Sequence, residues 1–145
     1  MKSIQGRVLA FGTFDLLHPG HLAYLTQARK LGRELVVIVA KDQNVLAFKG
    51  HLPVQSEQDR LQIVSSLKMV HSAFLGEKTD FFKKIKALQP EIVCQGYDQW
   101  PGKKKLEPLL QLHGINARVV QAKPYKTHKH KSTKIKQAIR NQKRI

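Results

Sequence analysis

Two short apolar segments near the start of the chain most constrain its fold. Residues 7–11 and 34–40 are rich in aliphatic and β-branched side chains, which is typical of strands buried on both faces of a parallel sheet. Between them, leucine and alanine recur every three positions within residues 19–31, and Gly32 follows directly. This spacing predicts a helix that ends at Gly32, so the chain opens with a strand, a helix and a strand.

The same alternation continues along the rest of the chain. Further helices are expected at residues 56–67, 81–88 and 106–112, and further strands at 69–75, 91–95 and 117–121. Parallel neighbours in a sheet need crossover helices, which pack on its two faces. The sequence therefore predicts an α/β fold, a Rossmann-like parallel five-stranded sheet with helices on both faces. A terminal helix is expected at residues 132–142.

The length of 145 residues fits one domain with a single core. Residues 1–145 are therefore expected to form one domain, with a basic tail at about 141–145. No apolar stretch approaches the roughly 20 residues of a membrane span, and the N-terminus lacks the layout of a signal peptide, so we expect a cytoplasmic protein without a membrane partner. The single cysteine, Cys94, lies in an apolar run, which predicts a buried thiol without a chemical role.

The formal net charge of +16 favours anionic partners, either nucleic acid or phosphorylated small molecules. One hypothesis is therefore a basic nucleic-acid-binding module, and the other is an enzyme that acts on phosphorylated substrates. The basic residues are not interleaved with aromatic side chains, and no signature of a nucleic-acid-binding motif occurs. The enzyme is the favoured hypothesis, and non-specific binding of nucleic acid is a possible additional property.

The loops that follow the predicted strands are the places to look for a site, because ligands of open parallel sheets bind beyond the carboxyl ends of the strands. Loops at 12–19, 41–53 and 96–102 are expected to share one rim. The first of them reads Gly12-Thr13-Phe14-Asp15-Leu16-Leu17-His18-Pro19-Gly20-His21 and opens a helix. A helix N-terminus offers free backbone N–H groups and the positive end of the peptide dipoles, so this loop is a candidate phosphate site.

Glycines and histidines in this loop suit a phosphate ligand. Gly12 permits a sharp exit from the strand, and Gly20 lets a ligand lie against the backbone. His18 and His21 are three residues apart at the helix start, so both can address one charged group, as phosphoryl transfer requires. The alternatives are a zinc site or two surface histidines. Zinc would need further Cys or His ligands at supporting spacing, and none is apparent, so no metal site made by the protein is expected.

Together, Gly12 to Asp15 and His18 to His21 resemble the HxGH signature of the cytidylyltransferase-like nucleotidyltransferase superfamily. The resemblance implies that His18 and His21 contact the phosphates and stabilise the charge of the transition state, while Thr13 and Phe14 line the turn through their backbone N–H groups. A second segment, Lys131-Ser132-Thr133-Lys134-Ile135, resembles the Ser-Thr-x-x-Ile element of the same superfamily. Ser132 and Thr133 are thereby predicted to hold the phosphates that leave as pyrophosphate, although the segment alone could be an ordinary helix cap.

The middle of the chain is similar to the archaeal-type FAD synthetases. The similarity lies in Val39-Ala40-Lys41-Asp42, Lys49-Gly50-x-x-Pro53, Glu57, Arg60, Phe74-Leu75-Gly76, Gln89-Pro90-Glu91-Ile92-Val93 and Gly96-x-Asp98-Gln99. It implies transfer of AMP from ATP to FMN with Mg²⁺ or another divalent metal. The segment at Asp98 can also be set against glycerol-3-phosphate cytidylyltransferases, which would use CTP, so both substrate pairs stay open. Related small enzymes are often dimers, which makes a homodimer possible.

Further residues are candidates for phosphate or acceptor binding. Lys49 could hold the acceptor or the triphosphate, or be a solvated lysine. The family resemblance implies that Arg60 could reach phosphate, and the alternative is a surface ion pair with Glu57. Asp98 suits a ribose hydroxyl or a base amine, or belongs to a simple turn. Asp15 could orient the histidine loop or lie near the metal.

The basic segment at residues 123–131 stands where cytidylyltransferases have a short loop led by arginine. Lys123 and Lys126 are its candidate phosphate ligands, although lysine lacks the bidentate fork of arginine. We interpret this segment as a possible mobile lid over the bound triphosphate.

Overall fold

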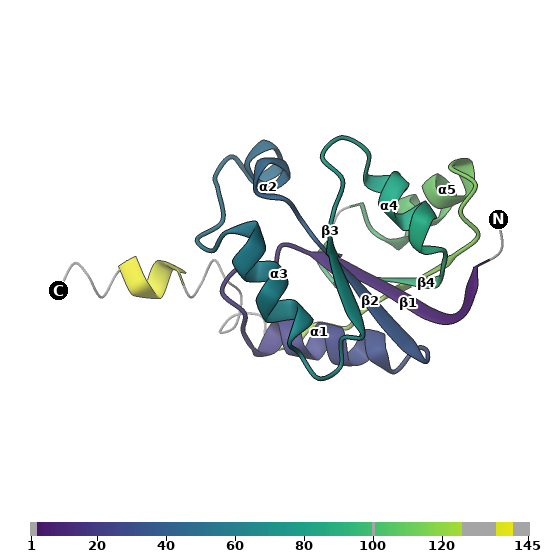
Figure 1. Cartoon of the computed structure of the whole chain (residues 1–145), viewed down its shortest axis with the longest axis horizontal. Helices are drawn as coiled ribbons and strands as arrows, with labels where there is room; N and C mark the ends of the chain where they lie inside the picture. Colours follow the sequence, from purple (N-terminus) through teal and green to yellow (C-terminus); the bar gives the residue numbers. More distant parts are fainter. Residues whose placement is uncertain (1–2, 100, 126–135, 141–145) are drawn as a thin grey trace.

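The computed structural model describes residues 3–99, 101–125 and 136–140. Its centre is a sheet of five strands, all paired in parallel and arranged in the order β3-β2-β1-β4-β5 (Figure 1). The strands are β1 (Ile4–Gly12), β2 (Glu34–Val39), β3 (Ser72–Leu75), β4 (Pro90–Gln95) and β5 (Arg118–Gln121). The predicted Rossmann-like sheet is confirmed. Its order changes direction between β1 and β4, where open parallel sheets bind their ligands.

Helices cover both faces of the sheet, as predicted (Figure 1). They are α1 (Pro19–Arg29), α2 (Asp42–Lys49), α3 (Glu57–Ser65), α4 (Phe81–Leu88) and α5 (Lys103–Leu112). Side chains of α1 and α3 pack in one core cluster, and side chains of α4 and α5 pack in the other. Within the described ranges, no helix combines the length and apolar character of a membrane span.

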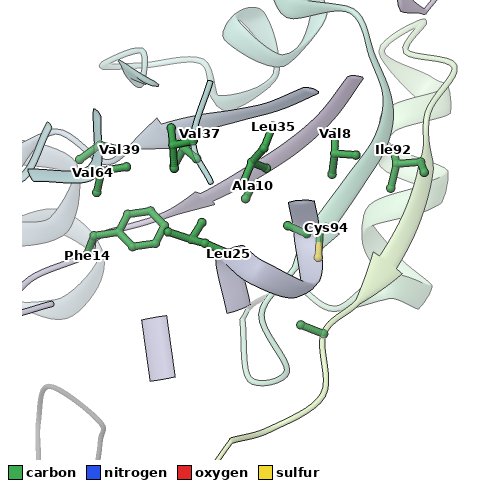
Figure 2. Packing of buried hydrophobic residues seen from close by; sticks show 13 residues of the cluster. Val8, Ala10, Phe14, Leu25, Leu35, Val37, Val39, Val64, Ile92 and Cys94 are labelled. Carbon is green, nitrogen blue, oxygen red and sulfur yellow. The ribbon is translucent and has the colours of Figure 1, made fainter. Parts of the chain in front are cut away.

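Successive side chains of one strand enter different clusters, because a strand points them to opposite faces. Val8 and Ala10 of β1 pack with Leu25 of α1, as Figure 2 shows, whereas Leu9 packs with α4 and α5. This explains why the predicted strands read as unbroken apolar runs. Cys94 is buried as expected, and burial raises the pKa of its thiol to about 11, so it stays protonated and unreactive at neutral pH.

One element was not predicted. Residues 41–53 were expected to be a loop, but Asp42–Lys49 form α2. Only Val45 of this helix is buried, so the sequence lacks the apolar periodicity that marks a packed helix. Gly50 ends the helix in the left-handed conformation, with φ of 83°.

Other boundaries differ from prediction by a few residues. β1 begins earlier, at Ile4, and β3 begins later, at Ser72, while α5 already begins at Lys103. Of the expected terminal helix, the structure describes residues 136–140, which are helical. The rest of the predicted terminal helix and the basic tail at 141–145 lie outside the described residues.

Candidate active site

The HxGH segment forms the N-terminal cap of α1. The Nδ1 atom of His18 accepts the backbone N–H of Gly20 at 3.1 Å, and the Nδ1 atom of His21 accepts the backbone N–H of His18 at 3.2 Å. This reciprocal pair is a capping box in which histidines replace the usual hydroxyl and carboxylate residues. Pro19 fits the first helical position because it has no N–H to satisfy. The spacing of the motif therefore has a structural reason as well as a chemical one.

The cap fixes the tautomer of both rings. A ring nitrogen that accepts a backbone N–H carries no proton, so a neutral imidazole in this position holds its proton on Nε2. The rings of His18 and His21 stack with their centroids 3.8 Å apart, and both line the same cleft. They therefore form a pair of Nε2–H donors on one wall.

The donors of this site differ in kind from those expected. The sequence predicted free backbone N–H groups at the start of the helix. In the structure, the N–H of Gly20 bonds to the His18 ring, and the N–H groups of His21 and Leu22 bond to the His18 carbonyl oxygen. What α1 offers an anion is thus chiefly the two imidazole rings, together with the positive end of its dipole.

His21 is held neutral. Burial lowers the pKa of its imidazole from 6.5 to about 3, and electrostatic effects of His18 and Lys49 act in the same direction, against the opposing effect of Asp15. At neutral pH, His21 is therefore an uncharged hydrogen-bond donor. It can stabilise developing negative charge without losing or gaining a proton.

This shift predicts a pH dependence of stability. Between about pH 3 and 6.5, the unfolded chain binds a proton at His21 that the folded chain does not bind, so the free energy of unfolding falls as pH drops through this window. One such group contributes a slope of up to about 1.4 kcal/mol per pH unit. Urea unfolding between pH 5 and 7.5 should show this slope in the wild type and a shallower one in His21→Gln. Parallel curves for the two proteins would contradict the low pKa.

The loop before the histidines has unusual backbone geometry. Phe14 and Leu16 have φ values of 56° and 53°, in the left-handed region that bulky side chains rarely adopt. The Phe14 ring is buried and stacks on Tyr24, with centroids 6.4 Å apart. Gly12 leaves room for it, because a Cβ atom at Gly12 would lie 3.1 Å from the Phe14 ring and would push the ring aside by a few tenths of an ångström. The left-handed backbone at Phe14 and Leu16 persists only where the surrounding structure holds it.

Asp15 is one of the groups that hold the loop. Its carboxylate is 4% exposed and accepts the backbone N–H groups of Val54 at 2.8 Å and Gln55 at 3.0 Å, and Lys136 Nζ at 2.5 Å. Burial alone would raise the pKa of Asp15, but the bonds to Lys136 and the two backbone groups outweigh it and lower the pKa. Of the two predicted roles, this arrangement fits the one in which Asp15 orients the histidine loop.

Arg60 is the second such group, and its placement differs from both sequence interpretations. It is fully buried, and its guanidinium donates to the carbonyl oxygens of Thr13 at 2.7 Å and Gln55 at 3.0 Å and to Asp42 at 2.7 Å. The side chain therefore points at protein acceptors rather than at phosphate. It also does not pair with Glu57, which instead accepts the backbone N–H of Asp42.

Two residues join the elements at the change of strand order: Tyr24, which the sequence did not single out, and Gln99, which was part of the family resemblance but was given no role. The Tyr24 hydroxyl donates to the Cys94 carbonyl oxygen at 2.5 Å and accepts the Phe11 N–H at 3.2 Å. Gln99 donates to the Phe11 carbonyl oxygen and accepts the Gly96 N–H, both at 2.6 Å. Only tertiary structure brings these partners together, so sequence spacing gave no signal for them.

One large cleft, of about 1010 Å³, collects most of the predicted site residues. Its lining includes Gly12, Thr13, Phe14, Asp15, His18, Gly20, His21, Lys49, Asp98 and Lys123. Arg60 is absent from this lining. Lys126, Ser132 and Thr133 lie outside the described residues, as does most of the predicted lid at 123–131. The volume is at the upper end for a single small ligand, so the cleft has room for two substrates.

Comparison with known proteins agrees with this geometry. Residues 9–138 match the sequence model of the family described as cytidylyltransferase-like. The FAD synthase of Methanothrix thermoacetophila is 51% identical over 121 residues, which are 83% of each chain. The FAD synthase of Methanohalophilus mahii is 45% identical over 139 residues, which cover 95% of this chain and 96% of the relative.

Solved structures share the fold. The crystal structure described as a lipopolysaccharide core biosynthesis protein from Thermoplasma volcanium is 38% identical with a TM-score of 0.80, and the match covers 84% of this chain and 99% of that one. Pantoate-beta-alanine ligase from Francisella tularensis, 15% identical, has a TM-score of 0.64 over 92% of this chain and 65% of its own. At that identity the likeness shows the fold alone.

The chain belongs to the cytidylyltransferase-like family, and it is a nucleotidyltransferase. Within the family the chain is of the FAD synthase type, because its curated relatives of that name are 45–51% identical over most of its length.

Proposed function

We propose that this chain transfers the AMP group of ATP to the phosphate of FMN, which yields FAD and pyrophosphate. The observation that carries the proposal is the 51% identity to an FAD synthase over 83% of both chains. The cleft supports it, because it is large enough for a nucleotide and a second substrate and holds the paired histidines on its wall.

The chemistry needs charge stabilisation more than proton transfer. A phosphate oxygen of FMN attacks the α-phosphorus of ATP in line, forms a new P–O bond, and breaks the bond to the departing pyrophosphate. The attacking oxygen is already anionic, so no general base is required. The Nε2–H groups of His18 and His21 are donors for the oxygens on which charge develops, and a neutral His21 needs no reorganisation to act this way.

We expect Mg²⁺ or another divalent metal to enter the site as part of the ATP complex, where it would offset charge on the triphosphate. Among the residues that the structure describes, no three or more His, Cys, Asp or Glu side chains form a group able to hold a metal ion. The Asp15 oxygens are bonded to Val54, Gln55 and Lys136. The triphosphate itself and water are therefore the expected ligands.

Other residues of the cleft are assigned to the nucleotide by their position. Asp98 follows β4 at the cleft and is our candidate for a ribose hydroxyl or the adenine amine. The Lys123 backbone is tied to α1 by two hydrogen bonds with Gln27, of 2.9 and 3.1 Å, which fixes where the basic segment begins. Lys126, Ser132 and Thr133 stay predicted phosphate ligands.

The substrate pair is tested by pyrophosphate release with Mg²⁺ for ATP and CTP, each combined with FMN or glycerol 3-phosphate. We expect release only with ATP and FMN, accompanied by FAD in the product mixture. Release only with CTP and glycerol 3-phosphate would assign the chain to the alternative reaction. No pyrophosphate release in any of the four mixtures would contradict both reactions and would favour the nucleic-acid-binding module.

Three expectations from the sequence stay predictions. The net charge of +16 would attract nucleic acid as well as anionic substrates, and such binding should weaken steeply with salt. A homodimer and a cytoplasmic location are the other two. Gel filtration with light scattering would test the homodimer, and fractionation of cells would test the cytoplasmic location.

A further inference from the structure

Three large apolar side chains of the cleft lining are exposed to solvent. Phe48 is 71% exposed, Val54 67% and Leu52 54%, and all three line the cleft. We call these three residues the apolar wall. Exposed apolar side chains that gather at one concave site mark a binding surface rather than chance exposure.

The apolar wall is fastened to the histidine loop. The backbone N–H of Val54 bonds to Asp15, three residues before His18. The first residue of α2, Asp42, pairs with Arg60, which also holds the Thr13 carbonyl oxygen. Asp15 and Arg60 thus connect the segment of the apolar wall to the loop that carries His18 and His21.

A third contact holds α2, which follows β2 at the carboxyl edge of the sheet (Figure 1). Asn44 donates to the Glu77 carbonyl oxygen at 2.9 Å, beyond the end of β3. Polar contacts at Asp42, Asn44 and Val54 thus fasten the segment that carries the apolar wall.

Another part of the cleft carries charged groups. It is formed by residues after β4 and β5, where Asp98 suits a ribose hydroxyl or a base amine and Lys123 suits a phosphate, beside the aromatic residues Tyr97 and Tyr125. The Gln99 side chain lines the same part, but it is already bonded to Phe11 and Gly96. A flat tricyclic ring gains most of its affinity from apolar contact, whereas a sugar gains it from hydrogen bonds. This difference favours the apolar wall for the ring of the acceptor and the part after β4 and β5 for the nucleotide.

We propose that the apolar wall of Phe48, Leu52 and Val54 binds the isoalloxazine ring of the acceptor, with Lys49 placed for the acceptor's phosphate. The inference rests on the proposed function and names the acceptor subsite within it. Lys49 follows Phe48 directly and lines the same cleft. Partial burial and the charge of Lys136 lower the pKa of Lys49, as fits a cation at a site that lacks its anion. A small polar acceptor such as glycerol phosphate would leave the wall without a use.

The test is direct binding of flavins, which is measured by the quenching of flavin fluorescence as the protein is added. Phe48→Ala and Leu52→Asn are each expected to raise the Kd for FMN by about tenfold, equivalent to about 1.4 kcal/mol. The KM for ATP should stay within about twofold, since the nucleotide is assigned to the part of the cleft after β4 and β5. Leu112→Asn is the matched control, because Leu112 is 78% exposed on α5 and outside the cleft lining.

Riboflavin, which lacks the phosphate, separates the two parts of the subsite. The wall variants should weaken riboflavin and FMN alike, whereas Lys49→Gln should weaken FMN and leave riboflavin unchanged. An unchanged Kd for both flavins in Phe48→Ala and Leu52→Asn, or an equal loss in Leu112→Asn, would overturn the inference.

Failure of the inference and failure of the proposed function give different results. If the wild type makes FAD while the wall variants bind flavin normally, only the subsite assignment is wrong. If the wild type binds flavin through the wall but makes no FAD, the subsite assignment stands and the proposed reaction is wrong.

Discussion

Replacing His18 by asparagine, or His21 by glutamine, should lower kcat by a factor of about 100 to 1000 while the melting temperature stays within about 3 °C. Asparagine is a preferred N-cap residue, and glutamine is a usual partner at the third position of a capping box. Both replacements can therefore keep the hydrogen bonds to the Gly20 and His18 N–H groups. Each removes one imidazole donor from the cleft.

The corresponding alanine variants provide the comparison. His18→Ala and His21→Ala lose the donor and the cap together, so each should lose about 1 kcal/mol of stability in addition to the same activity. Steady-state kinetics and thermal unfolding of the four variants separate the two roles. Normal kcat in His18→Asn and His21→Gln would show that the histidines serve only as a helix cap.

Replacing Arg60 by methionine should lower the free energy of unfolding by about 3–5 kcal/mol. The substitution keeps most of the apolar stem but leaves the Thr13 and Gln55 carbonyl oxygens and the Asp42 carboxylate without their donor. The Arg60 side chain is fully buried, so water cannot readily replace the lost bonds. Urea unfolding measures the effect.

Lys84→Met is the control for Arg60→Met. Lys84 pairs with Glu77 at 3.7 Å near the surface, and such pairs contribute about 0–1 kcal/mol. Equal and small losses in both variants would contradict the structural role of Arg60. A stable Arg60→Met protein with a raised KM for ATP would instead support the phosphate contact predicted from the family resemblance.

The sheet was predictable because its signal is local. The apolar runs of β1 and β2 follow from burial on both faces, and the crossover helices follow from the parallel pairing. α2 escaped prediction because Val45 is its only buried residue. Its helical state depends on anchors at Glu57 and Glu77, which lie far along the chain.

The candidate site was likewise predictable only where the signal is local. The pairing of His18 and His21 on one face follows from their spacing, and the family resemblance gave their role. Most partners of Asp15 and Arg60 could not be inferred, because they are distant in the sequence. Those of Asp15 lie 39 or more residues away. Of the partners of Arg60, Asp42 and Thr13 lie 18 and 47 residues away, and only Gln55 is near, at five residues. Long-range contacts of this kind leave no periodic trace in the sequence.

In the proposed reaction, this cleft joins AMP to FMN with the help of the paired histidines. The most direct measurement follows ATP labelled with ³²P at the α-phosphate, incubated with FMN, Mg²⁺ and either the wild type or the His21→Gln variant. We expect the label to enter FAD in step with pyrophosphate release in the wild type, and at a rate about 100 to 1000 times lower in the variant. Label that never enters FAD in the wild type, or that enters it at equal rates in both proteins, would contradict the account.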